Sequence, residues 1–407
     1  MLLLRQGIHC VDVVVSTKSE FHFARPMHLL WITGRTFGRD LCQTTQIQVA
    51  NALARRGWTV TFVAPETADT AAFVKSEGHG FTSGIVISNI PGLKSLSFER
   101  VLRKQLPRIL QDTMPDVAVC DWRGARGAWQ GLERYGIGWA MVDRGPPAYR
   151  SILGRLQWLH YDRAWNKAGK RAAVCFSVSK SHGEFIQKRF SLATPITTLP
   201  AAADATTFAV AASESSEGRP GIDRPLKIVY HGRLDRSRNV ANLVLVAEQL
   251  RNSGVDTELL LFGTGTSEKR LNRLARKFSW LTVLPKQPYS KVPELLTKMD
   301  VGALPMGNRL VWRTASPLKL FEYAASSMPI IATNIAAHRF EDEPEWIGLV
   351  DPNQMVDGMV RKLQSWVVDE RIEELGQNAR RELCDKYTWD HAVESAAEIL
   401  KNIAKSD

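Results

Sequence analysis

Residues that could bind a diphosphate gather in the second half of the chain. Arg233 and Arg238 follow the apolar run LKIVYHG, and Gly263-Thr264-Gly265 follows the run ELLLF. Ser316 and Pro317 then open a stretch of apolar residues at helical spacing, which predicts a helix capped by the serine and beginning at the proline. The free N–H groups of such a helix start attract anions by about 0.3–1 kcal/mol. Two guanidinium groups and a helix start would together suit a diphosphate.

A carboxylate follows in the same predicted helix. Glu322 lies about a turn and a half beyond Pro317. At this position it could accept hydrogen bonds from two neighbouring hydroxyl groups, such as those of a ribose. The simpler interpretation is an ordinary α/β unit with a solvated glutamate and surface arginines. Only the convergence of these groups on one place favours a nucleotide site.

Alternating strands and helices would bring these residues together. Strands are predicted at 226–232, 258–265, 281–285, 301–306 and 330–332, with helices at 240–251, 267–278, 292–298 and from 317 onward. Parallel strands place their carboxyl ends at one edge of the sheet, where ligands bind in such folds. The loops that carry the two arginines and the glycines therefore belong to one edge.

The first half of the chain has the same alternation. Strands are predicted at 28–33, 58–65, 116–120, 139–142, 174–179 and 197–200, and helices at 41–56 and 149–171. Loops are expected at 121–127 and from Asp143. Residues 97–110 form a basic amphipathic segment whose length Pro107 should limit. It is either a packed surface helix or a helix lying on a membrane surface.

Composition narrows the class of protein. The chain has 407 residues, 44% of them hydrophobic, and five cysteines without a C-x-x-C pair, which indicates a reducing compartment and no structural metal. No apolar run reaches the ~20 residues of a membrane span. The first 205 residues hold 26 Lys and Arg against 15 Asp and Glu, which accounts for the whole net charge of +11. This basic half predicts an anionic partner, although no nucleic-acid-binding motif supports DNA or RNA.

These motifs resemble those of the retaining nucleotide-sugar glycosyltransferases of family 4. The resemblance covers about residues 27–400 and is strongest at 227–333. HGRLDRSRN resembles the family's Gly-Arg-Leu…Lys motif, LFGTG its glycine turn, and SPLKLFEYAASSMPIIAT the sequence around its second glutamate. LPAAADATTF and YTWDHA resemble its interdomain segment and C-terminal helix.

The resemblance implies a GT-B fold, in which two Rossmann-like domains face each other across a cleft. The expected divisions are an extension at 1–26, an acceptor domain at 27–208, a linker at 209–225, a donor domain at 226–385 and a returning helix at 386–407. The implied reaction moves a sugar from a nucleoside diphosphate to an acceptor hydroxyl with retention of configuration.

The resemblance also assigns roles to residues. The reaction is expected to depend on Arg233, Arg238 and Glu322. The remaining donor contacts would be Gly232, Gly263, Gly265, Thr314, Ser316, Pro317, Leu318 and Lys319. The acceptor side would include Gly34, Arg35, Gly38, Arg39, Asp121, Asp143 and Arg144.

The chain departs from the family pattern in two places. Thr314 stands where the first of two glutamates is usual, and Asp143-Arg144-Gly145 occupies a loop in which the family often has a histidine. No D-x-D pair occurs, so we expect no metal and no other cofactor. A non-catalytic protein that binds a nucleotide sugar or glycan is the alternative.

The excess of basic residues in the first half of the chain indicates the kind of acceptor and the cellular location of the protein. It favours a phosphorylated or lipid-linked acceptor and a cytoplasmic protein that binds an anionic membrane surface peripherally, as in the biosynthesis of a glycan, glycolipid or cell-surface polysaccharide.

Overall fold

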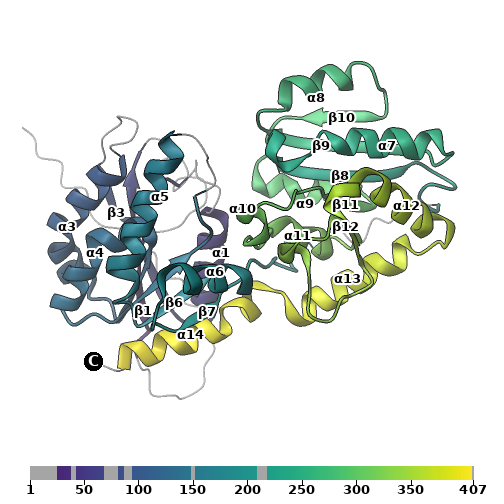
Figure 1. Ribbon diagram of the computed structural model, residues 1–407. Coiled ribbons are helices and arrows are strands. Elements are labelled where there is room, and N and C mark those ends of the chain that lie inside the picture. The colour runs from purple at the N-terminus through teal and green to yellow at the C-terminus, as the bar shows by residue number, and fades with distance from the viewer. Residues whose placement is uncertain are drawn as a thin grey trace, which may run out of the picture. The chain divides into compact units, whose positions relative to one another are not determined.

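The computed structural model describes residues 25–37, 43–67, 81–86, 94–147, 152–208 and 218–405. The chain divides into two compact units (Figure 1). The first comprises Met1–Leu199 and Val393–Asp407, and the second comprises Pro200–Ala392. No helix within the described ranges is both long and apolar enough to cross a bilayer.

The first unit is built on a parallel sheet of seven strands in the order β3-β2-β1-β4-β5-β6-β7. β4 and β5 are buried at every position, as expected for central strands covered on both faces. The strands are β1 (His28–Ile32), β2 (Thr59–Glu66), β3 (Phe81–Val86), β4 (Val117–Asp121), β5 (Trp139–Asp143), β6 (Val174–Ser177) and β7 (Ile196–Thr198).

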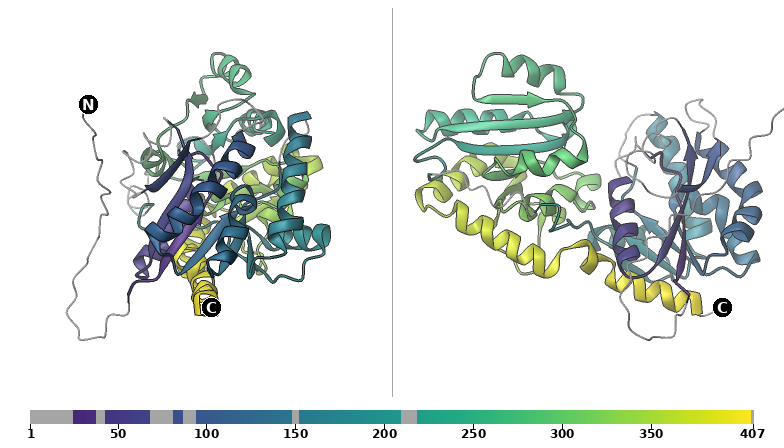
Figure 2. Two further views of the ribbon diagram at one scale, coloured as in Figure 1. Left: turned by 90° about the vertical axis from the view of Figure 1, so that its left-hand side faces the viewer. Right: turned by 180° about the vertical axis from the view of Figure 1, so that it is seen from behind.

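Helices cover both faces of this sheet. α3, α4 and α5 pack side by side on one face, and α1 covers the other (Figures 1 and 2). The helices are α1 (Gln43–Arg55), α3 (Lys94–Thr113), α4 (Trp122–Arg134), α5 (Ile152–Ala164) with the π-helical turn η1 (Trp165–Gly169), α6 (Lys180–Phe190) and α14 (Trp389–Lys405). α14 begins in the second unit, and its part from Val393 onward belongs to the first.

The second unit has a parallel sheet of six strands in the order β10-β9-β8-β11-β12-β13. Its strands are β8 (Leu226–Arg233), β9 (Thr257–Thr264), β10 (Leu281–Leu284), β11 (Val301–Leu304), β12 (Ile330–Thr333) and β13 (Ile347–Val350). The order reverses between β8 and β11, and such a switch point is where an open α/β sheet offers a ligand site beyond its carboxyl ends.

The second unit's helices connect and cover these strands. They are α7 (Asn242–Asn252), α8 (Glu268–Ala275), α9 (Val292–Leu296), α10 (Leu310–Arg313), α11 (Leu318–Ala325), α12 (Met355–Val368) and α13 (Ile372–Lys386). The described part of this unit also contains the short 3-10 turns η3 (Arg236–Arg238), η4 (Tyr289–Lys291), η5 (Ala336–His338) and η6 (Pro352–Gln354). The paired α/β units with parallel sheets confirm the predicted fold class.

Two local predictions in the first unit were wrong. Pro107 does not limit the basic amphipathic segment, because α3 runs through it from Lys94 to Thr113. The buried side chains of Leu102, Leu106 and Ile109 continue one apolar face across the proline, and this packing outweighs the lost backbone hydrogen bond.

The loop expected at 121–127 is instead the start of α4. Asp121 is its N-cap, and one carboxylate oxygen accepts from the N–H groups of Arg123 at 2.9 Å and Gly124 at 2.7 Å. The helix therefore begins directly after β4, without an intervening loop.

Several elements were not predicted at all. β3 and β13 are short strands at sheet edges, α6 lies between β6 and β7, and α12 follows the last strand, β13. α12 packs on α7 and shows a clear apolar stripe, so its absence from the prediction reflects missed periodicity in that stretch.

Residues 218–225, part of the predicted linker 209–225, belong to the second unit. Residues 209–217 lie outside the described ranges, but 218–225 form a turn fixed to the second unit. Arg224 makes two hydrogen bonds of 2.7 Å to the Asp300 carboxylate, and Arg219 pairs with Glu370. The division between units falls at Leu199, before Phe208, because Arg380 of α13 donates to the carbonyl groups of Ala205 and Phe208.

The Asp121 cap gives a stability prediction. Its other oxygen accepts from the Thr33 hydroxyl at 2.7 Å, so this buried carboxylate joins β1 to α4. Asp121→Ala should lower the free energy of unfolding by about 2–4 kcal/mol, because it removes a cap and leaves buried donors unpaired. Denaturant titration measures this loss. Asp112→Ala, in an exposed pair with Arg108, is the control and should change stability by no more than about 0.5 kcal/mol.

Candidate functional site

The candidate site lies at the carboxyl ends of β8 and β9, beside the start of α11. Gly232 and Arg233 end β8, and Gly263 lies next to them in β9. Gly263 has φ of 142°, and a Cβ there would overlap the carbonyl oxygen of Gly232. Only glycine permits these two backbones to approach so closely. The predicted glycine turn is therefore a packing requirement of the site itself.

Lys319 of α11 lies directly over Gly232. A Cβ on Gly232 would meet the Lys319 Cε at 2.8 Å and its Nζ at 3.0 Å. Burial and, to a smaller extent, the Arg238 cation lower the pKa of Lys319 to about 8, although the Glu322 carboxylate opposes both effects. The Lys319 ammonium therefore interacts with both a second cation and a carboxylate, and it loses its proton more easily than an exposed lysine does.

Arg233 is held by a neighbouring carboxylate. Its Nε and Nη2 donate to the two oxygens of Asp235, each at 3.0 Å. Asp235 also accepts from the backbone N–H of Thr266, which follows the β9 glycine turn. The pair fixes the direction of a guanidinium that remains 39% exposed.

Arg238 is held by an aromatic ring. Its guanidinium carbon lies 4.2 Å from the centre of the Trp312 ring, and Trp312 Nε1 donates to the carbonyl oxygen of Ser237 at 3.1 Å. A cation stacked in this way loses little entropy when it binds an anion. Trp312 belongs to the short helix α10, which lies between the strand predicted at 301–306 and the helix predicted from 317 onward.

Glu322 is 1% exposed, on the inner side of α11. His231 Nε2 lies 3.0 Å from its Oε2. Burial raises the pKa of Tyr289 well above its usual value, and the adjacent Glu322 carboxylate raises it further, so the Tyr289 hydroxyl stays protonated next to this group. Within the described part of the chain, neither Glu322 oxygen receives a hydrogen bond of good alignment.

The start of α11 differs from the prediction. Pro317 is the N-cap, and no side chain caps the helix. The Ser316 hydroxyl instead accepts a hydrogen bond from the backbone N–H of Ala201 at 3.0 Å, so it does not cap α11. The prediction of a Ser316 cap was therefore wrong, and the helix begins at Leu318, one residue after the expected Pro317.

Thr314 is 3% exposed, and its hydroxyl donates to the Leu310 carbonyl oxygen at 2.9 Å. It closes α10 as the C-cap residue. The position at which the family pattern has its first glutamate thus carries a hydroxyl group engaged with the backbone.

The predicted acceptor residues have mixed surroundings. Asp143 is fully buried and accepts from Tyr161 at 2.7 Å and Trp165 at 3.2 Å, with His182 Nε2 at 3.2 Å. Asp121 is likewise buried, as the cap of α4. Both carboxylates organise the ends of their strands from inside the unit, which the sequence did not indicate.

The other acceptor residues lie nearer the surface. The backbone N–H of Gly34 donates to Asp121, and Arg144 donates to the Leu199 carbonyl oxygen at 2.7 Å. Arg35 is half-buried after β1. Gly38 and Arg39 lie outside the described residues.

Three residues at the site were not assigned a role from sequence. His231 and Tyr289 flank Glu322, and Trp312 stacks on Arg238. The signal for His231 was its place immediately before Gly232 at the end of a predicted strand. Nothing in the local sequence distinguishes Tyr289.

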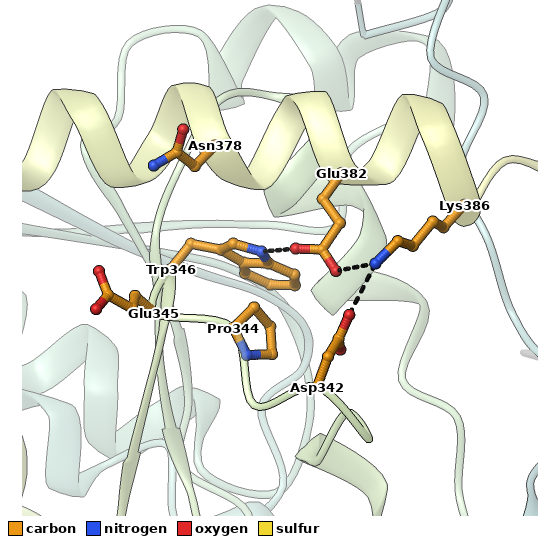
Figure 3. Close-up of a pocket in the computed structure, with 7 residues that line it drawn as sticks. All are labelled: Asp342, Pro344, Glu345, Trp346, Asn378, Glu382 and Lys386. Carbon is orange, nitrogen blue, oxygen red and sulfur yellow. Dashed lines mark hydrogen bonds and ion pairs between the residues drawn. The ribbon is translucent and has the colours of Figure 1, made fainter.

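A separate depression of about 290 Å³ lies at the opposite edge of the same sheet (Figure 3). It is formed by residues that precede β13 and by α13. Trp346 Nε1 donates to Glu382 at 2.6 Å, and Lys386 binds Asp342 at 2.7 Å and Glu382 at 3.2 Å. These polar groups satisfy one another, so the carboxyl ends of β8 and β9 remain the better candidate. In the described ranges, no three His, Cys, Asp or Glu side chains gather as metal ligands would.

Comparisons with known proteins identify two glycosyltransferase domains in the chain. Residues 43–207 match the model of Glycosyltransferase Family 4, and residues 213–382 match the model of Glycosyl transferases group 1. No curated protein sequence matches the chain.

Solved structures share the fold over nearly the whole chain. The sucrose-phosphate synthase of Thermosynechococcus elongatus is 15% identical with a TM-score of 0.70, covering 94% of this chain and 100% of that one. A glycosyltransferase of Rickettsia africae is 14% identical with a TM-score of 0.70 and the same coverage. HepE of Anabaena, in complex with UDP-glucose, is 12% identical with a TM-score of 0.68, covering 92% of this chain and 100% of that one.

Lys319 gives a prediction about pH. In the free protein its ammonium loses its proton near pH 8, so a diphosphate that binds above this pH must draw a proton back onto it. Affinity for inorganic pyrophosphate should therefore fall as the pH rises from about 7 to about 9, with proton uptake on binding. Calorimetry in buffers of different ionisation enthalpy measures this uptake. Lys319→Arg, which stays charged, should remove the uptake, and an unchanged uptake would contradict the assignment.

Proposed function

Because the chain carries a family 4 glycosyltransferase domain followed by a group 1 glycosyl transferase domain on the GT-B fold, we propose that it is a retaining hexosyltransferase. It transfers a sugar from a nucleoside diphosphate sugar to an acceptor hydroxyl. The observation that carries the proposal is the buried Glu322 carboxylate beside Lys319, near the carboxyl ends of β8 and β9, where Arg233 and Arg238 are also held.

The environment of Glu322 supports a donor with a vicinal diol. A buried carboxylate without well-aligned hydrogen bonds is costly, by about 1–3 kcal/mol or more. Two adjacent hydroxyl groups of a ribose would donate to its two oxygens and remove this cost. Lys319 lies over Gly232 and interacts with both Glu322 and Arg238, and Arg233 follows Gly232 in β8, so a diphosphate attached to that ribose would meet these cations.

The same cations suit the chemistry of the transfer. The bond between the sugar's anomeric carbon and the phosphate oxygen breaks, and a bond from the acceptor oxygen to the same face of that carbon forms. The acceptor's proton passes to the departing phosphate oxygen. Negative charge grows on that diphosphate, and fixed cations in a half-buried site stabilise it strongly. In this proposal, the protein's own cations neutralise the diphosphate without a metal ion.

The nucleotide-sugar class receives support from a structural neighbour. HepE of Anabaena was solved with UDP-glucose, and another structure of it holds UDP and glucose. A hexose on a nucleoside diphosphate is therefore the donor class that we propose for this chain, in glycan or glycolipid biosynthesis.

The acceptor is proposed to bind the first unit and to be anionic or lipid-linked. α3 exposes Arg100, Arg103, Lys104 and Arg108, and α5 exposes Leu156 and Leu159, each about half accessible. Exposed cations and exposed leucines on helices that pack on the same face of the sheet favour an anionic membrane surface. The enzyme would then act as a peripheral membrane protein.

A non-catalytic protein that binds nucleotide sugars is the second candidate. Thr314 favours it, because its hydroxyl is engaged with the Leu310 carbonyl group and supplies no carboxylate to a donor sugar. Hydrolysis of a bound nucleotide sugar, even if slow, would argue against this alternative.

A ligand panel tests the donor class. UDP, GDP and ADP, each alone and as its glucose conjugate, should be compared by thermal shift at one ionic strength. A ligand at 100 times its dissociation constant adds about 2.7 kcal/mol, so one family of nucleotides should raise the Tm clearly. The absence of any shift at millimolar concentrations would count against the proposed donor site.

Arg233 tests the catalytic role. Arg233→Ala should lower turnover at saturating donor by about 10²–10³-fold, because one cation on the leaving group is lost. Arg236→Ala, an exposed arginine in the adjacent turn, is the matched control and should stay within about two-fold. Near wild-type turnover in Arg233→Ala would refute the assignment.

Charge reversal tests membrane binding. Arg100→Glu with Lys104→Glu on α3 should weaken binding to vesicles containing phosphatidylglycerol at least ten-fold, at about 1 kcal/mol per charge near the surface. Lys269→Glu with Arg273→Glu has the same spacing and charge change on α8, and should bind as the wild type does. Equal losses in the two variants would show that net charge, and not the α3 face, controls binding.

A further inference from the structure

His231 is held rigidly next to the Glu322 carboxylate. It is the antepenultimate residue of β8, 8% exposed, immediately before Gly232. Its ring stacks on Phe262 with the centres 5.1 Å apart and the planes 13° apart, and it meets the Tyr323 ring edge-on at 5.4 Å. Its backbone N–H donates to the Tyr323 hydroxyl at 3.2 Å. The ring therefore has little freedom to turn.

The charge of His231 suits a neutral donor. Burial lowers its pKa, the Glu322 carboxylate opposes this shift, and Lys319 reinforces it. At neutral pH the imidazole is uncharged and carries one N–H group. With Nε2 at 3.0 Å from Glu322 Oε2, the tautomer with the proton on Nε2 is the favourable one.

The carboxylate is the mobile partner of this pair. The contact is short, but its alignment is poor. A carboxylate turns easily about its terminal torsion, whereas the stacked ring does not. A donor of hydrogen bonds that enters the site can therefore rotate Glu322 onto the fixed His231 N–H group, with Oε1 turned toward the ligand.

We propose that His231 is a positioning residue that orients Glu322 toward the ribose hydroxyls of the donor and so sets the preference for ribonucleotides over deoxyribonucleotides. The inference rests on the proposed function, because it assumes a nucleoside diphosphate at this site. His231 acts only through Glu322 and contacts neither the diphosphate nor the sugar that is transferred.

His231 is expected to control discrimination between ribose and deoxyribose, and not the affinity of the site for phosphate. A site whose buried polar groups require a substrate hydroxyl rejects the analogue that lacks it, because those groups then stay unpaired. Without His231, Glu322 would be free to turn away from the ribose. The preference for the hydroxyl should shrink, while binding of the diphosphate by Arg233, Arg238 and Lys319 should persist.

The test compares two substitutions at one position. His231→Phe keeps the stacking on Phe262 and removes both ring nitrogens. His231→Gln places an amide N–H near the position of Nε2. Calorimetry with UDP, GDP and ADP, with their 2′-deoxy and 3′-deoxy counterparts, and with inorganic pyrophosphate gives the ribose preference separately from phosphate affinity.

The expected result is a ribose preference at least ten-fold smaller in His231→Phe than in the wild type and largely restored in His231→Gln. Affinity for pyrophosphate should stay within about two-fold in both. An undiminished preference in a folded His231→Phe would overturn the inference and leave the proposed function standing. Parallel losses for pyrophosphate and the nucleotides would also overturn it, since they would indicate general damage to the site.

Two further outcomes distinguish the role of His231 from the proposed binding of a nucleoside diphosphate. Failure of the wild type to bind any of the three nucleoside diphosphates would overturn both the proposed function and the inference. If His231→Phe does not fold, Tyr323→Phe serves instead, because it removes only the hydroxyl that holds the His231 backbone. It should reduce the ribose preference in the same direction, and an unchanged preference would count against the inference.

Discussion

The close approach of β8 and β9 is the constraint on which the site depends. Gly263 lies against the Gly232 carbonyl group with a backbone conformation that side chains rarely permit, and Gly232 itself leaves room for Lys319 above it. A side chain at either glycine would push apart the strand ends or the lysine. Since His231 and Arg233 flank Gly232 in the same strand, this contact also sets the positions of the groups that meet Glu322 and Asp235.

The charges at this edge are coupled through one half-buried lysine. Arg238 repels the Lys319 ammonium and Glu322 attracts it. Burial is the largest cause of its lowered pKa, Arg238 adds to this effect, and Glu322 opposes it. Asp235 and Trp312 hold the two arginines in fixed orientations at this edge. The site is therefore a set of cations prepared in advance, whose mutual repulsion an incoming diphosphate would relieve.

The sequence predicted the repeating strands and helices well, because each central strand is a short, strongly apolar run with polar residues at its carboxyl end. It also predicted which loops share an edge, since parallel strands fix that. It could not predict which partner a polar side chain takes. Ser316 binds the Ala201 N–H group, which is distant in sequence, instead of its own helix, and Asp121 starts a helix where a loop was expected. Such choices depend on tertiary contacts that local patterns do not contain.

The two units use their buried carboxylates differently, and the difference identifies the site. In the first unit, Asp121 and Asp143 receive aligned donors from the protein itself, so each is already satisfied. In the second, Glu322 is as deeply buried but lacks such donors among the described residues, although His231 and Tyr289 lie next to it. A fold retains a buried charge at this cost only where something outside the chain completes its hydrogen bonds, or where the charge serves the reaction. The unsatisfied carboxylate, and not the number of charged residues, is what separates the candidate site from the structural ion pairs elsewhere.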